Sequence, residues 1–461
     1  MKKIFNILTI ALVAMLLSSC GLYNKYSRPE SATANAEKLY REVKGEAQDT
    51  TLNIANIAWR EMFKDKHLQR LIDSALVRNT DLRIANLRVG EAEAALKAAR
   101  LAYVPSFGFA PNGAYSSFAL EKGAWTYSVP VTMSWQVDIF GRLTNAKRRA
   151  KAAYEGSQYY AQAVQSRVVA MVANTYYTLV MLDAQLAIAE QTAKSWGENV
   201  ATIELLKDGG MSNEAAVAQT KATYFSICTM VNELREQVSL VENSLSIMLA
   251  DVPQHIERGT LAEQSAPEQL YVGIPLQLLS NRPDVQYAET MLMQSHYGEN
   301  EARAALYPSL SLGGNAGWTN VVGSAIINPG NLLLSAAASL FQPIFQNGAL
   351  RARLKMAKLQ HEQAALAFRQ TVLNAGNEVN TALEQCQTSR ANHSLIAQQI
   401  EALHLAVENT QLLMTHGSAT YLEVLYAQQA LLNAQLGEAE NKFSELQGVV
   451  NLYQALGGGR K

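Results

Sequence analysis

The stretch TYSVPVTMSWQVDIF, from Thr126 to Phe140, alternates apolar and polar side chains over its whole length. Successive side chains of a β-strand point to opposite faces, so one face of this strand is apolar and the other polar. A soluble half-buried strand alternates in the same way but usually spans only about 5–6 residues. Long alternation with an aromatic residue near each end is typical of a membrane-barrel strand whose apolar side faces lipid. The residues predicted to face lipid are Val129, Val131, Met133, Trp135 and Val137.

Three further segments, which begin at Ser106, Ser309 and Leu332, are predicted strands that could pair with this one. Four strands cannot close a barrel, for which about eight is the practical minimum. Since an open sheet edge is not tolerated in lipid, several chains must pool their strands if these strands span a bilayer.

The chain repeats one plan in two halves. Asp81 corresponds to Asp284, 203 residues later, and Gly210 corresponds to Gly417, 207 residues later. Each half is predicted to contain a helix, two strands, a very long helix, a glycine-containing turn and a second long helix. The period is far longer than that of solenoid repeats, which indicates duplication of a whole fold unit.

The helical stretches are unusually long. The first helices are expected over roughly 66–101 and 283–306, and the longest stretches, Gly141 to Lys207 and Ala349 to His416, contain no proline. About 65 residues make roughly 100 Å of helix. Such a helix needs long neighbours along its whole length. Periodicity alone fits a coiled-coil rod as well as a tube, and the strands favour the tube.

The N-terminus has the three parts of a secretory signal: Lys2 and Lys3, an apolar run from Ile4 to Leu17, and small residues after it. The run is shorter than the roughly 20 apolar residues of a membrane-spanning helix. It ends in LSSC, similar to a bacterial lipoprotein box, which predicts cleavage after residue 19 and a lipid on Cys20. A plain signal followed by an incidental cysteine is the alternative.

Composition argues against several classes of protein. The net charge of −1 argues against a nucleic-acid partner. No hydrolase, metalloprotease or nucleotide-binding motif occurs, and the seven histidines are scattered, so neither a catalytic nor a metal site is predicted. Met291 and Met293 fit core packing better than soft-metal binding. The sequence does not establish whether Cys228 and Cys386 pair.

The chain resembles the TolC-like outer membrane factor family, in its lipoprotein branch, over nearly the whole mature length. The residues that carry the resemblance are Cys20, Tyr26-Ser27-Arg28-Pro29, Trp59 through Phe63 to Leu68, Ala75 through Asn79 to Leu82, Tyr103-Val104-Pro105, Asp138-Ile139-Phe140-Gly141, Asn281-Arg282-Pro283-Asp284, Tyr307-Pro308-Ser309-Leu310, Pro343-Ile344-Phe345, Tyr421-Leu422-Glu423-Val424-Leu425 and Leu456-Gly457-Gly458-Gly459.

The resemblance implies an α+β membrane protein and a homotrimer in the outer membrane of a Gram-negative bacterium. Each chain would give four strands to a twelve-stranded barrel, its long helices would form a periplasmic tube, and a small α/β region would lie at the equator. The trimer would be the exit duct of a tripartite efflux pump, with a periplasmic adaptor and a proton-driven inner-membrane transporter as partners. Neither a catalytic site nor a cofactor is implied, apart from the diacylglycerol and N-acyl lipid on Cys20.

The expected domains are a signal peptide (1–19), an anchor and equatorial segment (20–65), a first repeat (66–251), a linker (252–274), a second repeat (275–457) and a tail (458–461). Two alternative functions fit the same sequence. One is a duct for type I protein secretion, and the more distant one is a structural coiled-coil lipoprotein.

The predicted gate lies at the hairpin turns. Leu413 and Met414 come one turn before Gly417 and would form an apolar constriction, with His416 beside them. Asp208, at the other turn, is the further candidate. Plain hairpin packing is the alternative reading of these residues.

Overall fold

A computed structural model of the chain describes residues 25–29, 39, 53–117, 122–267, 269–272, 278–319 and 331–460. Cys20, the predicted lipidation site, lies outside these residues. The chain divides into two compact units, each built from three stretches. Unit 1 comprises Met1–Thr33, Leu87–Tyr159 and Gln286–Gln370, and unit 2 comprises Ala34–Asn86, Tyr160–Val285 and Thr371–Lys461.

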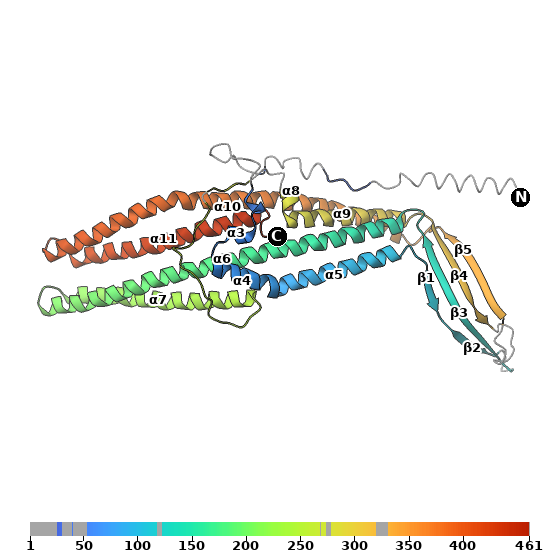
Figure 1. The fold of residues 1–461 in the computed structure, drawn as a ribbon, viewed down its shortest axis with the longest axis horizontal. Helices are drawn as coiled ribbons and strands as arrows, with labels where there is room; N and C mark the ends of the chain where they lie inside the picture. The colour runs from blue at the N-terminus through green and yellow to red at the C-terminus, as the bar shows by residue number, and fades with distance from the viewer. Residues whose placement is uncertain are drawn as a thin grey trace. The chain divides into compact units, whose positions relative to one another are not determined.

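The two halves of the chain form matching helices (Figure 1). The longest, α6 (Arg142–Asp208) and α10 (Ala349–Thr415), have 67 residues each. The helices that follow them, α7 (Glu214–Met248) and α11 (Tyr421–Ala455), have 35 each, and α5 (Thr80–Leu101) and α9 (Pro283–Ala304) have 22 each. The shorter elements are η3 (Ile54–Asn56), α3 (Trp59–Met62), α4 (Lys66–Arg78) and α8 (Leu278–Asn281). These equal lengths confirm the duplication. Within the described residues, no helix combines the length and the apolar character needed to cross a membrane.

The strands form one antiparallel sheet within unit 1. They are β1 (Ser106–Phe109), β2 (Asn112–Ser116), β3 (Ala124–Val137), β4 (Ser309–Thr319) and β5 (Asn331–Phe341). Both β1 and β2 pair with β3, and the order across the sheet continues to β4 and then β5. Because β1 and β2 share one position, the sheet has the four strand positions that the sequence predicts.

The predicted helix from Lys66 to Leu101 is in fact two helices. It breaks at Asn79, whose side-chain oxygen accepts a hydrogen bond from the Leu82 amide at 3.1 Å. The Asn79 side-chain nitrogen donates to the Met248 carbonyl at 2.9 Å. Asparagine favours the position before a helix, so Asn79 ends α4 and starts α5.

The predicted strand from Thr126 to Phe140 ends early, at Val137. Asp138 is not part of the polar face of the sheet. Its carboxylate accepts hydrogen bonds from the amides of Leu143 and Thr144 at 2.9 and 2.8 Å. These amides belong to the first turn of α6, where a helix lacks internal partners for its N–H groups, so Asp138 serves the helix rather than the sheet.

The core of unit 2 lies between its long helices. One cluster joins α6 to α7 through Leu182, Ala189, Val231 and Leu234. A second cluster joins these two helices to α11 through Trp196, Ile227, Leu425 and Leu432. The hairpins of the two halves therefore share a core. Cys228 is half-buried, Cys386 is fully buried, and both are free thiols.

Candidate functional site

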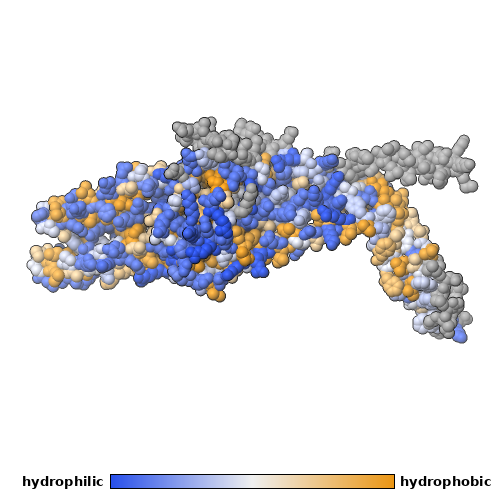
Figure 2. All heavy atoms as spheres, viewed as in Figure 1, coloured by the Kyte–Doolittle hydropathy of each residue, from blue (hydrophilic) through white to orange (hydrophobic). Residues whose placement is uncertain are grey.

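The pairing register gathers apolar side chains on one face of the sheet. Residues directly opposite each other in neighbouring strands lie on the same face. Met133 of β3 faces Phe107 of β1 and Gly314 of β4, which in turn faces Ala336 of β5. The other members of this apolar face are Val129, Val131, Trp135, Val137, Phe109, Leu310, Leu312, Ala316, Trp318, Leu334, Ala338 and Leu340. Hydrophobic residues cover much of the visible surface of the sheet (Figure 2).

The opposite face is polar. Thr132 of β3 faces Gly108 and Asn315, and the Ser335 hydroxyl donates to the Asn315 side-chain oxygen at 2.7 Å. Further polar residues of this face are Ser128, Ser134, Gln136, Ser311 and Ser339. The five residues predicted to face lipid thus lie together on one face, and their contact with lipid stays a prediction.

Aromatic side chains lie near both ends of the apolar face. The rings of Tyr115 and Trp125 lie 5.1 Å apart at the end next to the β2–β3 connection. At the other end, Trp135 Nε1 donates to the Tyr103 carbonyl at 2.9 Å. The two tryptophans are separated by about 34 Å of strand, which corresponds to a height of about 25 Å at the usual tilt of 35–45°. This height matches the apolar band of an outer-membrane barrel, about 25 Å tall.

The two hairpin turns of unit 2 have the same geometry. Gly210 and Gly417 adopt φ values of +76° and +73°, which side chains with a Cβ rarely adopt. In each turn, the N–H after the glycine donates at 2.8 Å to the carbonyl five residues earlier. This arrangement ends a helix while satisfying its last carbonyls, so the duplication extends to the turns.

The candidate gate residues are divided between these turns. Leu413 is 46% exposed, Met414 is half-buried, and His416 is exposed just after the end of α10. Asp208 ends α6 and lies 3.8 Å from the Lys207 ammonium. Over the described parts of both turns, no hydrogen bond or ion pair joins Asp208 to the second turn. Leu413, Met414 and His416 therefore lie together at the second turn, whereas Asp208 lies at the first. That these four residues close the tube stays a prediction.

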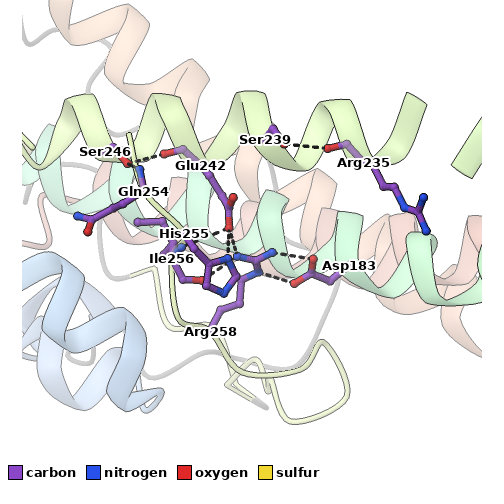
Figure 3. A network of polar contacts seen from close by, with 9 residues as sticks. All are labelled: Asp183, Arg235, Ser239, Glu242, Ser246, Gln254, His255, Ile256 and Arg258. Atoms are coloured by element: carbon purple, nitrogen blue, oxygen red, sulfur yellow. Dashed lines mark hydrogen bonds and ion pairs between the residues drawn. The ribbon is translucent and has the colours of Figure 1, made fainter. Parts of the chain in front are cut away.

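A partly buried ion-pair cluster holds the linker on the first hairpin (Figure 3). Arg258 of the linker reaches Asp183 of α6 and Glu242 of α7, with its Nη2 2.9 Å from Asp183 Oδ1. His255 Nδ1 lies 2.8 Å from Glu242 Oε1, and the Ile256 amide donates to the same oxygen at 3.2 Å. Burial alone would raise the pKa of Glu242, but the hydrogen bonds from Arg258 and Ile256 lower it overall. The linker therefore ties α6 to α7.

The same linker contacts the second hairpin. Arg390 of α10 donates to the Pro267 carbonyl, and its Nε lies 2.8 Å from Glu445 Oε1 of α11. Lys442 Nζ donates to the Ala262 carbonyl at 3.1 Å. The linker thus bridges both hairpins, a role that sequence reasoning missed because composition does not reveal which distant charges a segment will meet.

The N-terminal segment is attached to α9 within unit 1. Arg28 binds the Glu289 carboxylate with two hydrogen bonds, at 2.8 Å from Nε and 2.6 Å from Nη2. Tyr26 lies edge-on against His296, with ring centroids 5.9 Å apart. These contacts hold residues 26–28 against α9.

One family model matches both halves of the chain. It is described as outer membrane efflux protein, and it matches residues 71–250 and 274–458. These two matches cover the two repeats and leave out most of the linker.

Curated relatives and solved structures align over nearly the full length. The Escherichia coli K12 cation efflux system protein CusC is 29% identical, over 97% of this chain and 98% of its own. The toluene efflux pump outer membrane protein TtgC of Pseudomonas putida is 28% identical, over 98% and 96%. A crystal structure of CusC superposes with a TM-score of 0.83 at 27% identity, covering 95% of this chain and 100% of that one. The open state of the Neisseria gonorrhoeae MtrE outer membrane channel gives 0.83 at 25% identity, covering 96% and 99%.

Proposed function

The chain belongs to the outer membrane efflux protein family, and we propose that three copies of it form the exit duct of a tripartite efflux pump. Family membership confirms the predicted fold, the outer membrane location and the efflux function. The single observation that carries the proposed assembly is the sheet, which has an apolar face, four strand positions and an edge strand at each side. Unpaired edges are not tolerated in lipid, and twelve strands from three chains would leave none.

Exposed leucines on α10 support contacts between copies. Leu359, Leu366 and Leu373 follow one another at intervals of seven residues, as do Leu405 and Leu412, and all five are exposed in the single chain. Apolar residues repeating every seven residues along a helix are typical of a seam between long helices. Helices of neighbouring copies would cover this seam and complete a periplasmic tube.

The proposed partners are a periplasmic membrane-fusion adaptor and an inner-membrane transporter, of the proton-driven type. The relative from Escherichia coli is named for cation efflux and the one from Pseudomonas putida for toluene efflux. Similar ducts thus serve different cargo, which supports selection of the cargo by the partners. The duct itself would conduct small molecules passively.

We further propose that Cys20 carries the lipid anchor. The attachment of Arg28 to Glu289 supports this, because it holds the N-terminal segment within reach of the membrane beside unit 1. Intact mass of the purified protein should show residues 1–19 missing and a diacylglycerol and an N-acyl chain added. Cys20→Ala should remain unprocessed or lose the lipid. A variant with the normal mature mass would contradict the proposal, and Cys228→Ala serves as the control that leaves the lipid in place.

Conductance in planar bilayers tests the duct and its gate. If Leu413 and Met414 close the resting tube by apolar packing, the wild-type conductance should stay low and flat with salt after correction for bulk conductivity. Leu413→Ser or Met414→Ser should raise it severalfold, because a hydroxyl in place of either side chain admits water. Charge-based closure would instead weaken as the Debye length falls from about 10 Å at 0.1 M to about 3 Å at 1 M.

A matched control for the gate is Leu395→Ser, an exposed α10 leucine that lies farther from the turn and outside the seven-residue series. It should leave the conductance unchanged. A steep rise of wild-type conductance with salt, or no response to either gate variant, would show that the constriction lies elsewhere. Asp208 would then be the next residue to test. A protein that never conducts, in any variant, would contradict the duct itself.

A further inference from the structure

Basic side chains gather where the helices of unit 1 adjoin the sheet. The ends of α5 and α9 lead into β1 and β4, and α6 and α10 begin shortly after β3 and β5. Between residues 142 and 154 and between 349 and 361 the chain has no acidic residue. The basic cluster consists of Lys97, Arg100, Arg142, Lys147, Arg148, Arg149, Lys151, Arg351, Arg353, Lys355 and Lys358.

This charge is unfavourable for the helices that carry it. Neither α6 nor α10 has an acidic residue in its first turn, although a helix N-terminus favours negative charge. On α10, Arg351, Lys355 and Lys358 lie on one face at i, i+4 and i+7, a spacing at which like charges repel. All three are exposed, and no hydrogen bond or ion pair reaches their side chains from the described residues. An anion outside the chain would relieve this repulsion.

Apolar residues lie between the sheet and this charge. Ile344 and Phe345, just after β5, are 96% and 79% exposed. A cavity of about 170 Å³ opens at the same level, lined by Arg142 and Arg353 together with aromatic side chains that include Phe140. The order along the chain is thus an apolar sheet face, exposed apolar and aromatic residues, and then basic residues. The same order is found across the interface of a bilayer, from hydrocarbon to headgroups.

We propose that the basic cluster binds the headgroups of anionic phospholipids in the leaflet next to the helices. The proposal rests on the proposed function, because it requires the sheet to span the membrane. Near a membrane surface, each Lys or Arg adds to the attraction between the protein and anionic lipid. The cavity would receive a phosphate between Arg142 and Arg353, whose Nη2 lies 3.8 Å from Glu301 Oε1 and would turn from it to the phosphate, with the glycerol and upper acyl carbons against Phe140.

The test measures lipid preference of the full-length assembly in detergent. Native mass spectrometry would compare bound phosphatidylglycerol with bound phosphatidylcholine at equal concentrations. The wild type should prefer phosphatidylglycerol by tenfold or more, and 0.5 M salt during the titration should reduce that preference. Arg351→Gln, Lys355→Gln and Lys358→Gln together should bring the ratio close to one, whereas Arg351→Lys with Lys355→Arg and Lys358→Arg should retain it.

Lys64→Gln, Lys66→Gln and Lys194→Gln together remove the same charge from exposed positions of unit 2 and should keep the preference. Equal preference in the wild type and the α10 triple variant, or equal loss in the unit 2 control, would overturn the proposal. The proposal would also be overturned if the α10 triple variant altered the cation-to-anion permeability of the channel but not the lipid ratio, because the basic cluster would then face the lumen. If the proposed function is wrong because the sheet does not span the membrane, the protein will fail to insert into vesicles. That failure is distinguishable from a change in the lipid ratio.

Discussion

Replacing Met133 by arginine is expected to cost about 2–4 kcal/mol per chain, the range for a cation near the middle of the lipid face of a barrel. Met133 lies in the inner strand β3, between Phe107 and Gly314, on the face where every strand position contributes apolar residues. A guanidinium there would have to enter hydrocarbon or displace the strand. Since the penalty recurs in each copy, we expect the assembled form to be lost.

The matched control is Thr132→Arg, on the adjacent residue and the opposite face. Thr132 faces Gly108 and Asn315 across the sheet, so a long polar side chain has space and polar neighbours. Recovery of trimer from the outer membrane, followed by electrophoresis without boiling, measures both variants. Equal loss of trimer in the two would mean that the faces of the sheet are wrongly assigned.

Replacing Arg282 by methionine is expected to destabilise unit 2 by about 1.5–3 kcal/mol, the usual contribution of hydrogen bonds made by a charged group. The Arg282 side chain is only 8% exposed. Its Nε lies 2.9 Å from Asp284 Oδ1, and its Nη1 lies 2.7 Å from Glu378 Oε2 and 3.0 Å from the Ala455 carbonyl. The start of α9 is thereby joined to α10 and to the end of α11, and methionine would remove all of these contacts, while the 40% exposed Asp284 side chain could still be hydrated.

Unfolding by guanidinium in detergent, followed by the helical circular dichroism signal, measures this loss. The control is Arg235→Met, which removes an exposed partner of Glu190 and should cost at most about 1 kcal/mol. Burial alone would raise the pKa of Asp284, but Arg282 holds it below its usual value. The stabilisation should therefore be complete above the unfolded-state pKa of about 3.9 and disappear as pH falls through the lower folded-state value. Similar losses from the two substitutions would contradict the buried role of Arg282.

Local patterns were sufficient to predict most of the architecture. The alternation in β3 indicated two chemically different faces, and the pairing register places the five predicted lipid-facing residues on one of them. The absence of proline predicted both 67-residue helices almost to their ends. Such features follow from the period of the chain itself, because the side-chain direction in a strand or helix is fixed by neighbours a few residues away.

Boundaries set by side-chain hydrogen bonds were predicted less well. Asn79 breaks a helix that the pattern continues, and Asp138 caps α6 where the alternation implied a strand. The N-capping preference of asparagine is a signal that could have located the first boundary. It would not have located the second, because Asp138 lies four residues before α6 begins.

The sequence by itself determined the duplication, the order of helices and strands, the two faces of the sheet and the family to which the chain belongs. Only the tertiary structure decided that the linker bridges both hairpins through Arg258 and Arg390, that Arg282 joins α9 to α10 and α11, and that basic residues gather beside the sheet. The physical reason is the distance along the sequence between the residues that determine each feature. Helix and strand periods depend on residues close together in sequence, whereas an ion pair such as Arg258–Asp183 depends on where folding brings two charges that lie 75 residues apart.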